Sequence, residues 1–311
     1  MAPKPVSSQP RSKIAWGEKV RRIFRAAGEA SRVLLGRKPA GRALTVFPDD
    51  IFIVSYPRSG NTWTRFLIGN LVYHDDPLTF ANVEARIPEI YLFPDRILRS
   101  LPRPRTLKSH ECFDPRYKRT IYIVRDPRDV AVSYYHYAIK RKRIEEGYPL
   151  DDFVPRFIAA EFDIAWNWAA GWNDHVMSWL CLRQGSTGFL LLRYEDMLQN
   201  TANELAKVAS FLQIEPTPEK LAQAIELSSA DHMRKLEKKQ QGDWALTKAT
   251  RHDKPFVRAA TFGGWRSALS PKSVDAIESA WGPVMRNLGY ALSAGSPVLP
   301  PMNSETVGYD G

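Results

Sequence analysis

The sequence predicts an α/β fold, a single domain with a central parallel sheet flanked by helices. Short apolar runs rich in β-branched residues, at 51–54, 106–108, 120–124 and 189–192, are the predicted strands. They alternate with longer segments that have helical periodicity. Alternation of this kind is typical of βα units, whose parallel strands gather ligand sites at their carboxyl ends. Polar motifs are therefore expected directly after the strands.

Charge and composition predict three parts. Residues 1–48 form a basic arm and linker, 49–292 the globular domain, and 293–311 a flexible tail rich in Pro, Gly and Ser. The arm carries nearly all of the formal net charge of +10, and its apolar residues recur at helical spacing between 12 and 36. A basic amphipathic helix of this kind fits peripheral contact with an anionic membrane or packing on the main domain, and both interpretations stay open.

Several function classes are disfavoured by the same composition. The two cysteines, Cys112 and Cys181, lie in no C-x-x-C or Cys/His cluster, so neither a disulfide framework nor a metal site is predicted. No apolar run approaches the roughly 20 residues of a membrane-spanning helix, and a cytoplasmic location is expected. Because the basic charge is concentrated in the arm, no specific nucleic-acid partner is predicted.

The first predicted strand, 51–54, runs into a polar turn and then a helix that extends to about Tyr73. Backbone N–H groups at the start of a helix have no intrahelical partner and carry the positive end of its dipole, so an anion binds there readily. Gly60 allows close approach of the backbone, and Arg58 adds charge. The nucleoside-triphosphate P-loop is excluded because it needs two glycines and a lysine in register. Hydrogen bonds or a helix cap are expected from Ser59, Asn61 and Thr62.

A second polar motif follows the strand at 120–124. Pro127 suits the first turn of a helix that runs from Asp126 to Lys140. Arg125 at the strand tip and Ser133, eight residues later, reach one phosphate only if the strand tip and the helix face converge. Ion pairs at the helix terminus are expected of Arg128 and Asp129.

Together the motifs resemble the sulfotransferases that use 3′-phosphoadenosine 5′-phosphosulfate (PAPS). Residues 56–63 are similar to the family's Y-P-K-S-G-T-T-W loop, and 125–135 to its R-[DN]-P-[RK]-D-x-x-x-S-x-[YF] motif. Residues 228–233 resemble T-S-F-D-x-M, with Ala230 in the phenylalanine place, and 258–265 resemble R-K-G-x-x-G-D-W. The resemblance covers residues 51–287 in the right order and implies a P-loop-like strand–loop–helix that binds the phosphosulfate.

The resemblance implies PAPS as the donor co-substrate, its bisphosphate product PAP, and no metal. Trp63 is the expected stacking partner of adenine, whereas Ala230 leaves one side of the base without its usual aromatic neighbour. The residues carried over as donor-binding are Arg58, Ser59, Gly60, Asn61, Thr62, Trp63, Arg125, Ser133, Tyr194, Ser228, Met233, Arg258, Ala259 and Ala260.

Residues 107–110 end a predicted strand and resemble the family's K-T-H segment. His110 is the candidate general base, because an imidazole accepts a hydroxyl proton near neutral pH. Lys108 and Arg58 are the candidate cations beside the leaving phosphate oxygen. His175 also matches a family segment, but a core or pocket-wall histidine explains it equally well, so it stays outside the catalytic set.

The predicted reaction is in-line transfer of a sulfuryl group to a hydroxyl or amine of a small-molecule or lipid acceptor. A nucleotide-dependent kinase and a catalytically silent, membrane-associated nucleotide-binding protein are the alternatives. The acceptor pocket is expected from residues 75–104, 141–160 and 238–256, which do not identify the acceptor. The family's dimer motif, K-x-x-x-T-V-x-x-x-E, is absent after Trp265, so the oligomeric state is open.

Overall fold

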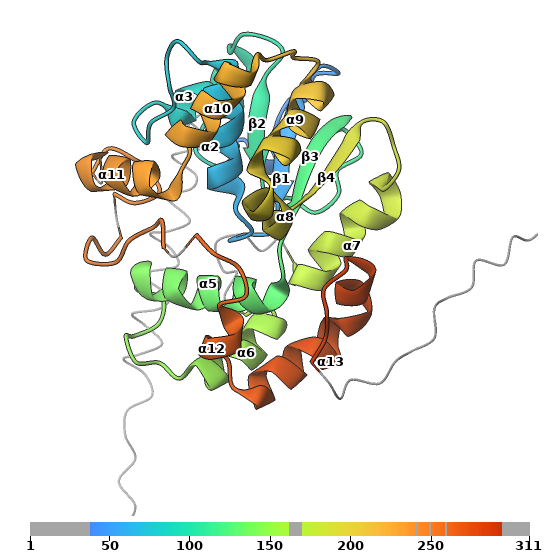
Figure 1. Ribbon diagram of the computed structural model, residues 1–311, viewed down its shortest axis with the longest axis vertical. Coiled ribbons are helices and arrows are strands. Elements are labelled where there is room, and N and C mark those ends of the chain that lie inside the picture. Colours follow the sequence, from blue (N-terminus) through green and yellow to red (C-terminus); the bar gives the residue numbers. More distant parts are fainter. Residues whose placement is uncertain (1–37, 162–169, 241, 249, 259, 294–311) are drawn as a thin grey trace, which may run out of the picture. The chain divides into compact units, whose positions relative to one another are not determined.

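The computed structural model describes residues 38–161, 170–240, 242–248, 250–258 and 260–293 (Figure 1). These residues fall into two compact units. The smaller unit comprises residues 38–45 and 89–101, with the 3-10 helix η1 (Gly41–Ala43) and helix α4 (Asp95–Arg99). Within it, the Asp95 carboxylate accepts the Thr45 N–H at 2.6 Å and its hydroxyl at 2.9 Å. The predicted arm helix at 12–36 and nearly all of the predicted tail lie outside the described residues.

A parallel four-stranded sheet forms the centre of the larger unit, in the order β2–β1–β3–β4. In the register, Ile53 of the central strand lies opposite Lys108 on one side and Ile121 on the other. The predicted α/β class with a parallel sheet is confirmed. The strands are β1 (Ile51–Ser55), β2 (Thr106–Ser109), β3 (Arg119–Val124) and β4 (Phe189–Arg193).

The two faces of the sheet are covered by different helices because side chains alternate along each strand. Ile53 and Ile121 join the main apolar core with residues of α2 and α9. Their neighbour Tyr122 points the other way and packs on Trp179 of α7, with 5.8 Å between ring centroids. Both faces are therefore buried, which explains why the strands read as continuous apolar runs.

Three helices share the same kind of start. A side-chain oxygen at the N-cap accepts a backbone N–H of the first turn, and the next residue is a proline: Asp126–Pro127, Thr217–Pro218 and Ser270–Pro271. The helices of the larger unit are α2 (Asn61–Val72), α3 (Val83–Arg86), α5 (Pro127–Lys140), α6 (Leu150–Ile158), α7 (Trp172–Arg183), α8 (Tyr194–Gln199), α9 (Thr201–Leu212), α10 (Pro218–Leu227), α11 (Ala230–Gln240), α12 (Trp265–Ala268) and α13 (Pro271–Asn287).

The helices gather in two groups (Figure 1). Helices α2, α9 and α10 contact one another over the sheet, and α5, α6, α12 and α13 form a group near the carboxyl ends of β1 and β3. The turn from β1 into α2 and the step from β3 into α5 lie at this same edge. Polar motifs that are far apart in the sequence are thereby brought to one place.

Three segments outside the sheet have their own local structure. The proline-rich stretch 74–104 contains two short helices, α3 and α4. Helix α7 begins at Trp172, after the extended N-cap Gly171; residues 162–169 lie outside the described part. The described residues between 242 and 264 form turns and bends around Gly242, Pro255 and Gly263. Among the described residues, no helix is long and apolar enough to cross a membrane.

Candidate functional site

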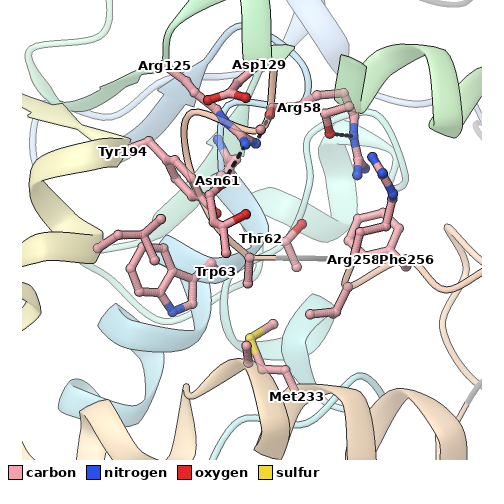
Figure 2. Close-up of a pocket in the computed structure, with 18 of the residues that line it drawn as sticks. Arg58, Asn61, Thr62, Trp63, Arg125, Asp129, Tyr194, Met233, Phe256 and Arg258 are labelled. Carbon is pink, nitrogen blue, oxygen red and sulfur yellow. Dashed lines mark hydrogen bonds between the residues drawn. The ribbon is translucent and has the colours of Figure 1, made fainter. Parts of the chain in front are cut away.

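A pocket of about 530 Å³ lies where the strands end, a volume typical of small-molecule sites. Its walls come from the turn between β1 and α2, the ends of β2 and β3, one face of α5, the start of α8, the α10–α11 junction and residues 256–258 and 260–264 (Figure 2). Arg125 and Ser133 both line it, so the strand tip and helix face converge as the second motif requires.

The backbone of the turn is held in an unusual conformation. Arg58 and Gly60 have φ angles of 70° and 98°, both in the left-handed region. A Cβ atom added to Gly60 would lie 2.4 Å from Cδ2 of Tyr194, so glycine is required by the backbone and by the neighbouring ring. Gly60 is the N-cap of α2, and no side chain caps this helix. The first-turn N–H groups are thus available to an anion.

The polar side chains of the turn have different tasks. Asn61 donates its amide to the Ile53 carbonyl at 3.3 Å and to Ser55 Oγ at 3.2 Å, which fastens the turn to β1. Thr62 lines the pocket. Ser59 is buried, and its hydroxyl has no hydrogen-bond partner among the described residues. The side chain of Asn61 therefore shapes the cradle, and its direct contact with a donor stays a prediction.

Three arginines surround one part of the pocket. Arg58 Nε donates to Ser133 Oγ at 3.3 Å, and its guanidinium lies 4.6 Å from the centroid of the Tyr137 ring. Figure 2 shows the charged ends of Arg58 and Arg258 close to each other. Burial, followed by the charges of Arg125 and Arg258, lowers the pKa of Arg58 to about 10, so it stays charged at neutral pH. Such a concentration of cations favours a multiply charged anion.

Arg125 spans the gap between the turn and the loop at 260–264. It donates to the Arg58 carbonyl at 3.4 Å and to the Thr261 carbonyl at 3.1 Å, and its guanidinium lies 4.3 Å from the centroid of the Tyr194 ring. Its Nε is buried without a partner among the described residues. This guanidinium N–H can therefore donate to an anion that binds in the pocket.

Ion pairs are predicted for Arg128 and Asp129 at the start of α5, and the structure contains those of Arg128. Arg128 pairs with Asp126 at 2.7 Å and with Glu278 at 2.6 Å. Asp129 instead accepts the backbone N–H groups of Gly263 at 2.6 Å and Trp265 at 3.0 Å. Burial raises the pKa of its carboxyl. Within the part of the chain that the structure describes, Asp129 forms no ion pair; its carboxylate anchors the loop that contains Ala260 to α5.

An apolar wall lies beside Trp63. The Trp63 indole donates to the Ser228 carbonyl at 3.0 Å and meets the Tyr194 ring edge-on. The hydroxyl of Ser228 accepts from the Asn70 amide at 2.9 Å, so this side chain joins α10 to α2, and donor contact by it stays a prediction. Figure 2 shows Trp63 and Met233 on the side of the opening away from the arginines. Further apolar lining includes Leu198, Ile225, Val257 and Phe256.

His110 and Lys108 line the same pocket from the end of β2. The Nδ1 atom of His110 lies 2.7 Å from the Ser55 carbonyl, which acts as the acceptor and places the ring proton on Nδ1. The lone pair is then on Nε2. Burial, followed by the charge of Lys108, lowers the pKa of His110 well below its usual value. The imidazole is neutral at pH 7 and can accept a proton.

His175 is not part of the pocket lining. It is fully buried, with Nδ1 at 2.8 Å from the Tyr122 hydroxyl and Nε2 at 3.1 Å from the His110 carbonyl. Burial lowers its pKa to about 4. Of the two interpretations left open by the sequence, the core histidine is the correct one, and His175 supports the backbone of the candidate base.

The motif at 258–265 contributes only in part to the pocket lining. Arg258 and Ala260 line the pocket, and Ala260 has a φ of 52°, the left-handed conformation for which glycine is better suited. Ala259 lies outside the described residues. The sequence reasoning missed Asp129 and His136 as pocket residues, and it expected Phe256 only as part of the acceptor wall at 238–256. Their closeness to Ser133 and Arg258 in the chain was the available signal.

The comparisons agree with this geometry. The family model described as "Sulfotransferase domain" matches residues 48–289. The chain belongs to the sulfotransferase family. Mouse sulfotransferase 1B1 is 27% identical over 251 residues, which are 75% of this chain and 82% of that relative. Cytosolic sulfotransferase 12 of Arabidopsis thaliana is 27% identical over 300 residues, covering 88% of each chain.

Solved structures show the same fold. Mouse sulfotransferase SULT7A1 complexed with PAP has a TM-score of 0.64 at 24% identity, covering 80% of this chain and 87% of its own. Retinol dehydratase in a complex with retinol and PAP has a TM-score of 0.66 at 19% identity, covering 83% and 86%. The predicted family, PAPS-dependent sulfotransferases, and the predicted enzyme class are confirmed, and the comparisons favour neither the kinase nor the silent binding protein.

Proposed function

We propose that this sulfotransferase moves a sulfuryl group from PAPS to a hydroxyl or amine of a small-molecule acceptor, with His110 as the general base. The observation that carries the proposal is that Arg58, Arg125 and Arg258 converge in one pocket beside the uncapped N-terminus of α2. A nucleotide with anionic groups at two positions fits these two features together.

Separate parts of the pocket fit separate parts of the donor. The first-turn N–H groups of α2 suit the 5′-phosphosulfate. Arg125, Arg258 and Ser133 suit the 3′-phosphate, because two guanidinium groups and a hydroxyl line the same part of the pocket and can donate to it. Trp63 with the aliphatic wall suits adenine, and it offers apolar surface where Ala230 supplies no ring. The side chains present therefore fit the whole donor.

The proton and charge movements follow from the residues at the end of β2. The donor supplies a sulfuryl group whose bond to the phosphate oxygen breaks, leaving the electron pair on that oxygen, as the acceptor oxygen or nitrogen bonds to sulfur. His110 takes the acceptor proton at Nε2, because Nδ1 is held by the Ser55 carbonyl. Lys108 stabilises the negative charge on the departing oxygen and can return a proton to it.

The position of Arg58 bears on the role proposed for its charge. Its guanidinium is bonded to Ser133 and lies over the rings of Tyr137 and Phe256. This arrangement supports charge stabilisation of the bound nucleotide, whereas a direct contact with the leaving oxygen stays a prediction. Lys108 is therefore the stronger candidate for the leaving-group cation.

The acceptor side is less defined. Small-molecule acceptors fit the similar proteins, since retinol dehydratase forms a complex with retinol and PAP. Of the described residues in the three segments expected to form the acceptor walls, only Phe256 lines the donor pocket. A lipid acceptor, contact of residues 12–36 with a membrane, and a cytoplasmic location all remain predictions.

Calorimetric titration without magnesium tests the proposal, with 3′,5′-adenosine bisphosphate compared with ATP. The bisphosphate should bind more tightly, and Arg125→Ala should weaken it by roughly 10- to 100-fold, because a charge-assisted contact is lost. Arg116→Ala, which removes an exposed arginine outside the pocket, should leave binding unchanged. No bisphosphate binding, or a preference for ATP, would overturn the assignment of the donor.

A further inference from the structure

The segment that contains Arg258 has no regular secondary structure of its own. Its backbone between 250 and 258 is bonded instead by charged side chains from two helices. Lys140, at the end of α5, donates to the carbonyls of Arg251 at 2.9 Å and Lys254 at 2.5 Å. The Arg251 N–H returns a bond to the Lys140 carbonyl at 3.0 Å. One end of the segment is thus fixed to α5.

The other end is fixed to α11 by Glu237. One carboxylate oxygen accepts the Phe256 N–H at 2.5 Å and the other accepts the Val257 N–H at 2.9 Å. Glu237 is only 6% exposed, so both bonds are shielded from water. A third bond, from Arg234 of the same helix to the Arg258 carbonyl at 2.7 Å, completes the attachment.

We propose that Glu237 is a positioning residue that aims Arg258 at the 3′-phosphate of the donor. Glu237 does not line the pocket, and it acts through the two peptide groups that precede Arg258. The inference rests on the proposed donor, PAPS. Helix α11 also places Met233 against the apolar wall, one turn before Glu237. One helix therefore sets both the adenine wall and the approach of Arg258.

A carboxylate is well suited to this task. Two N–H groups point at one buried side chain, and only a carboxylate offers an acceptor oxygen to each. In Glu237→Gln, the amide NH₂ would face one of the two N–H donors, which must then lose its bond or move. The segment would shift at Phe256 or Val257, next to Arg258.

Comparison of two nucleotides separates positioning from general support. In Glu237→Gln, affinity for 3′,5′-adenosine bisphosphate should fall about tenfold, the equivalent of one buried hydrogen bond. Affinity for 5′-AMP, which lacks the group that Arg258 is aimed at, should stay within about twofold. Glu226→Gln makes the same chemical change on an exposed part of α10 and should alter neither affinity.

A double-mutant cycle then locates the effect. In the Arg258→Ala background, Glu237→Gln should cause no further loss of bisphosphate affinity, because its action passes through Arg258. Equal losses for both nucleotides, or additive losses in the cycle, would overturn the inference. If Glu237→Gln does not fold, Arg234→Gln makes the same test from the surface of α11, where loss of the bond to the Arg258 carbonyl should also spare 5′-AMP. A wild-type protein that does not prefer the bisphosphate over 5′-AMP would instead contradict the proposed donor.

Discussion

The two sides of the donor pocket are built in opposite ways. The turn at 56–63 joins a central strand to a helix, and its geometry follows from Gly60, Asn61 and the α2 N-terminus. The described residues of 250–264 form no strand or helix, and their backbone is bonded by the side chains of Lys140, Glu237 and Asp129. Anion binding therefore rests on a strand-to-helix turn, the regular side, and on a segment held by side chains distant in the sequence, the irregular side.

The difference predicts separate effects on turnover and on binding. His110→Ala removes the proton acceptor at the end of β2, so kcat should fall by about 10²- to 10⁴-fold while bisphosphate affinity is retained. Arg258→Ala should instead weaken nucleotide binding more than it lowers kcat. Turnover with labelled donor and calorimetry on the same preparations make the comparison, and His74→Ala, outside the pocket, is the control. Unchanged turnover in His110→Ala would remove it from the mechanism.

A methyl group at Gly60 should disrupt the regular side. Gly60→Ala places Cβ 2.4 Å from the Tyr194 ring at a φ of 98°, so we expect a loss of roughly 2–5 kcal/mol in unfolding free energy, with weaker bisphosphate binding. Gly147 has a φ of 93° but nothing within 4 Å of an added Cβ. Gly147→Ala therefore measures the backbone strain alone. Equal effects in urea denaturation would show that the contact with Tyr194 is unimportant.

Low pH should reduce the free energy of unfolding through His175, which bonds to the backbone of His110. His175 titrates near pH 6.5 when unfolded, and burial lowers its folded pKa to about 4, so the unfolded state binds more protons between these values. Its contribution is fully present above pH 6.5 and is lost as the pH falls towards 4, by on the order of 3 kcal/mol. Urea denaturation at several pH values measures this slope, which should flatten in His175→Gln. An unchanged slope would assign the acid sensitivity to other groups.

The smallest effect is expected at the irregular side. Ala260 has a φ of 52°, so Ala260→Gly should relieve strain and stabilise the protein by up to about 1 kcal/mol. Ala222→Gly, at an exposed position inside α10, should instead destabilise by about 1 kcal/mol. Thermal unfolding should show Tm shifts of opposite sign in the two variants if the left-handed conformation at Ala260 is strained. Shifts of the same sign would contradict this account.

Sequence reasoning succeeded where the functional residues lie in short motifs directly beside the strand ends that position them. The strands, the α2 start and the approach of Arg125 to Ser133 follow from short motifs next to strand ends, where topology brings residues together. It failed for Asp129, because an acidic residue in the first helical turn has several partners within reach and only the fold selects Gly263 and Trp265. The attachment of 250–258 by Glu237 likewise depends on tertiary placement.

The ring of Tyr194 has a consequence for the order in which this protein becomes functional. The ring belongs to the helix that follows β4, yet it fills the space over Gly60, in the turn that leaves β1. During synthesis the phosphate turn leaves the ribosome long before Tyr194 does. A nascent chain that stops short of β4 would have the complete turn sequence but lack one of its walls. The protein should therefore bind nucleotide only after β4 has joined the sheet. Nucleotide binding would then indicate that the sheet is complete.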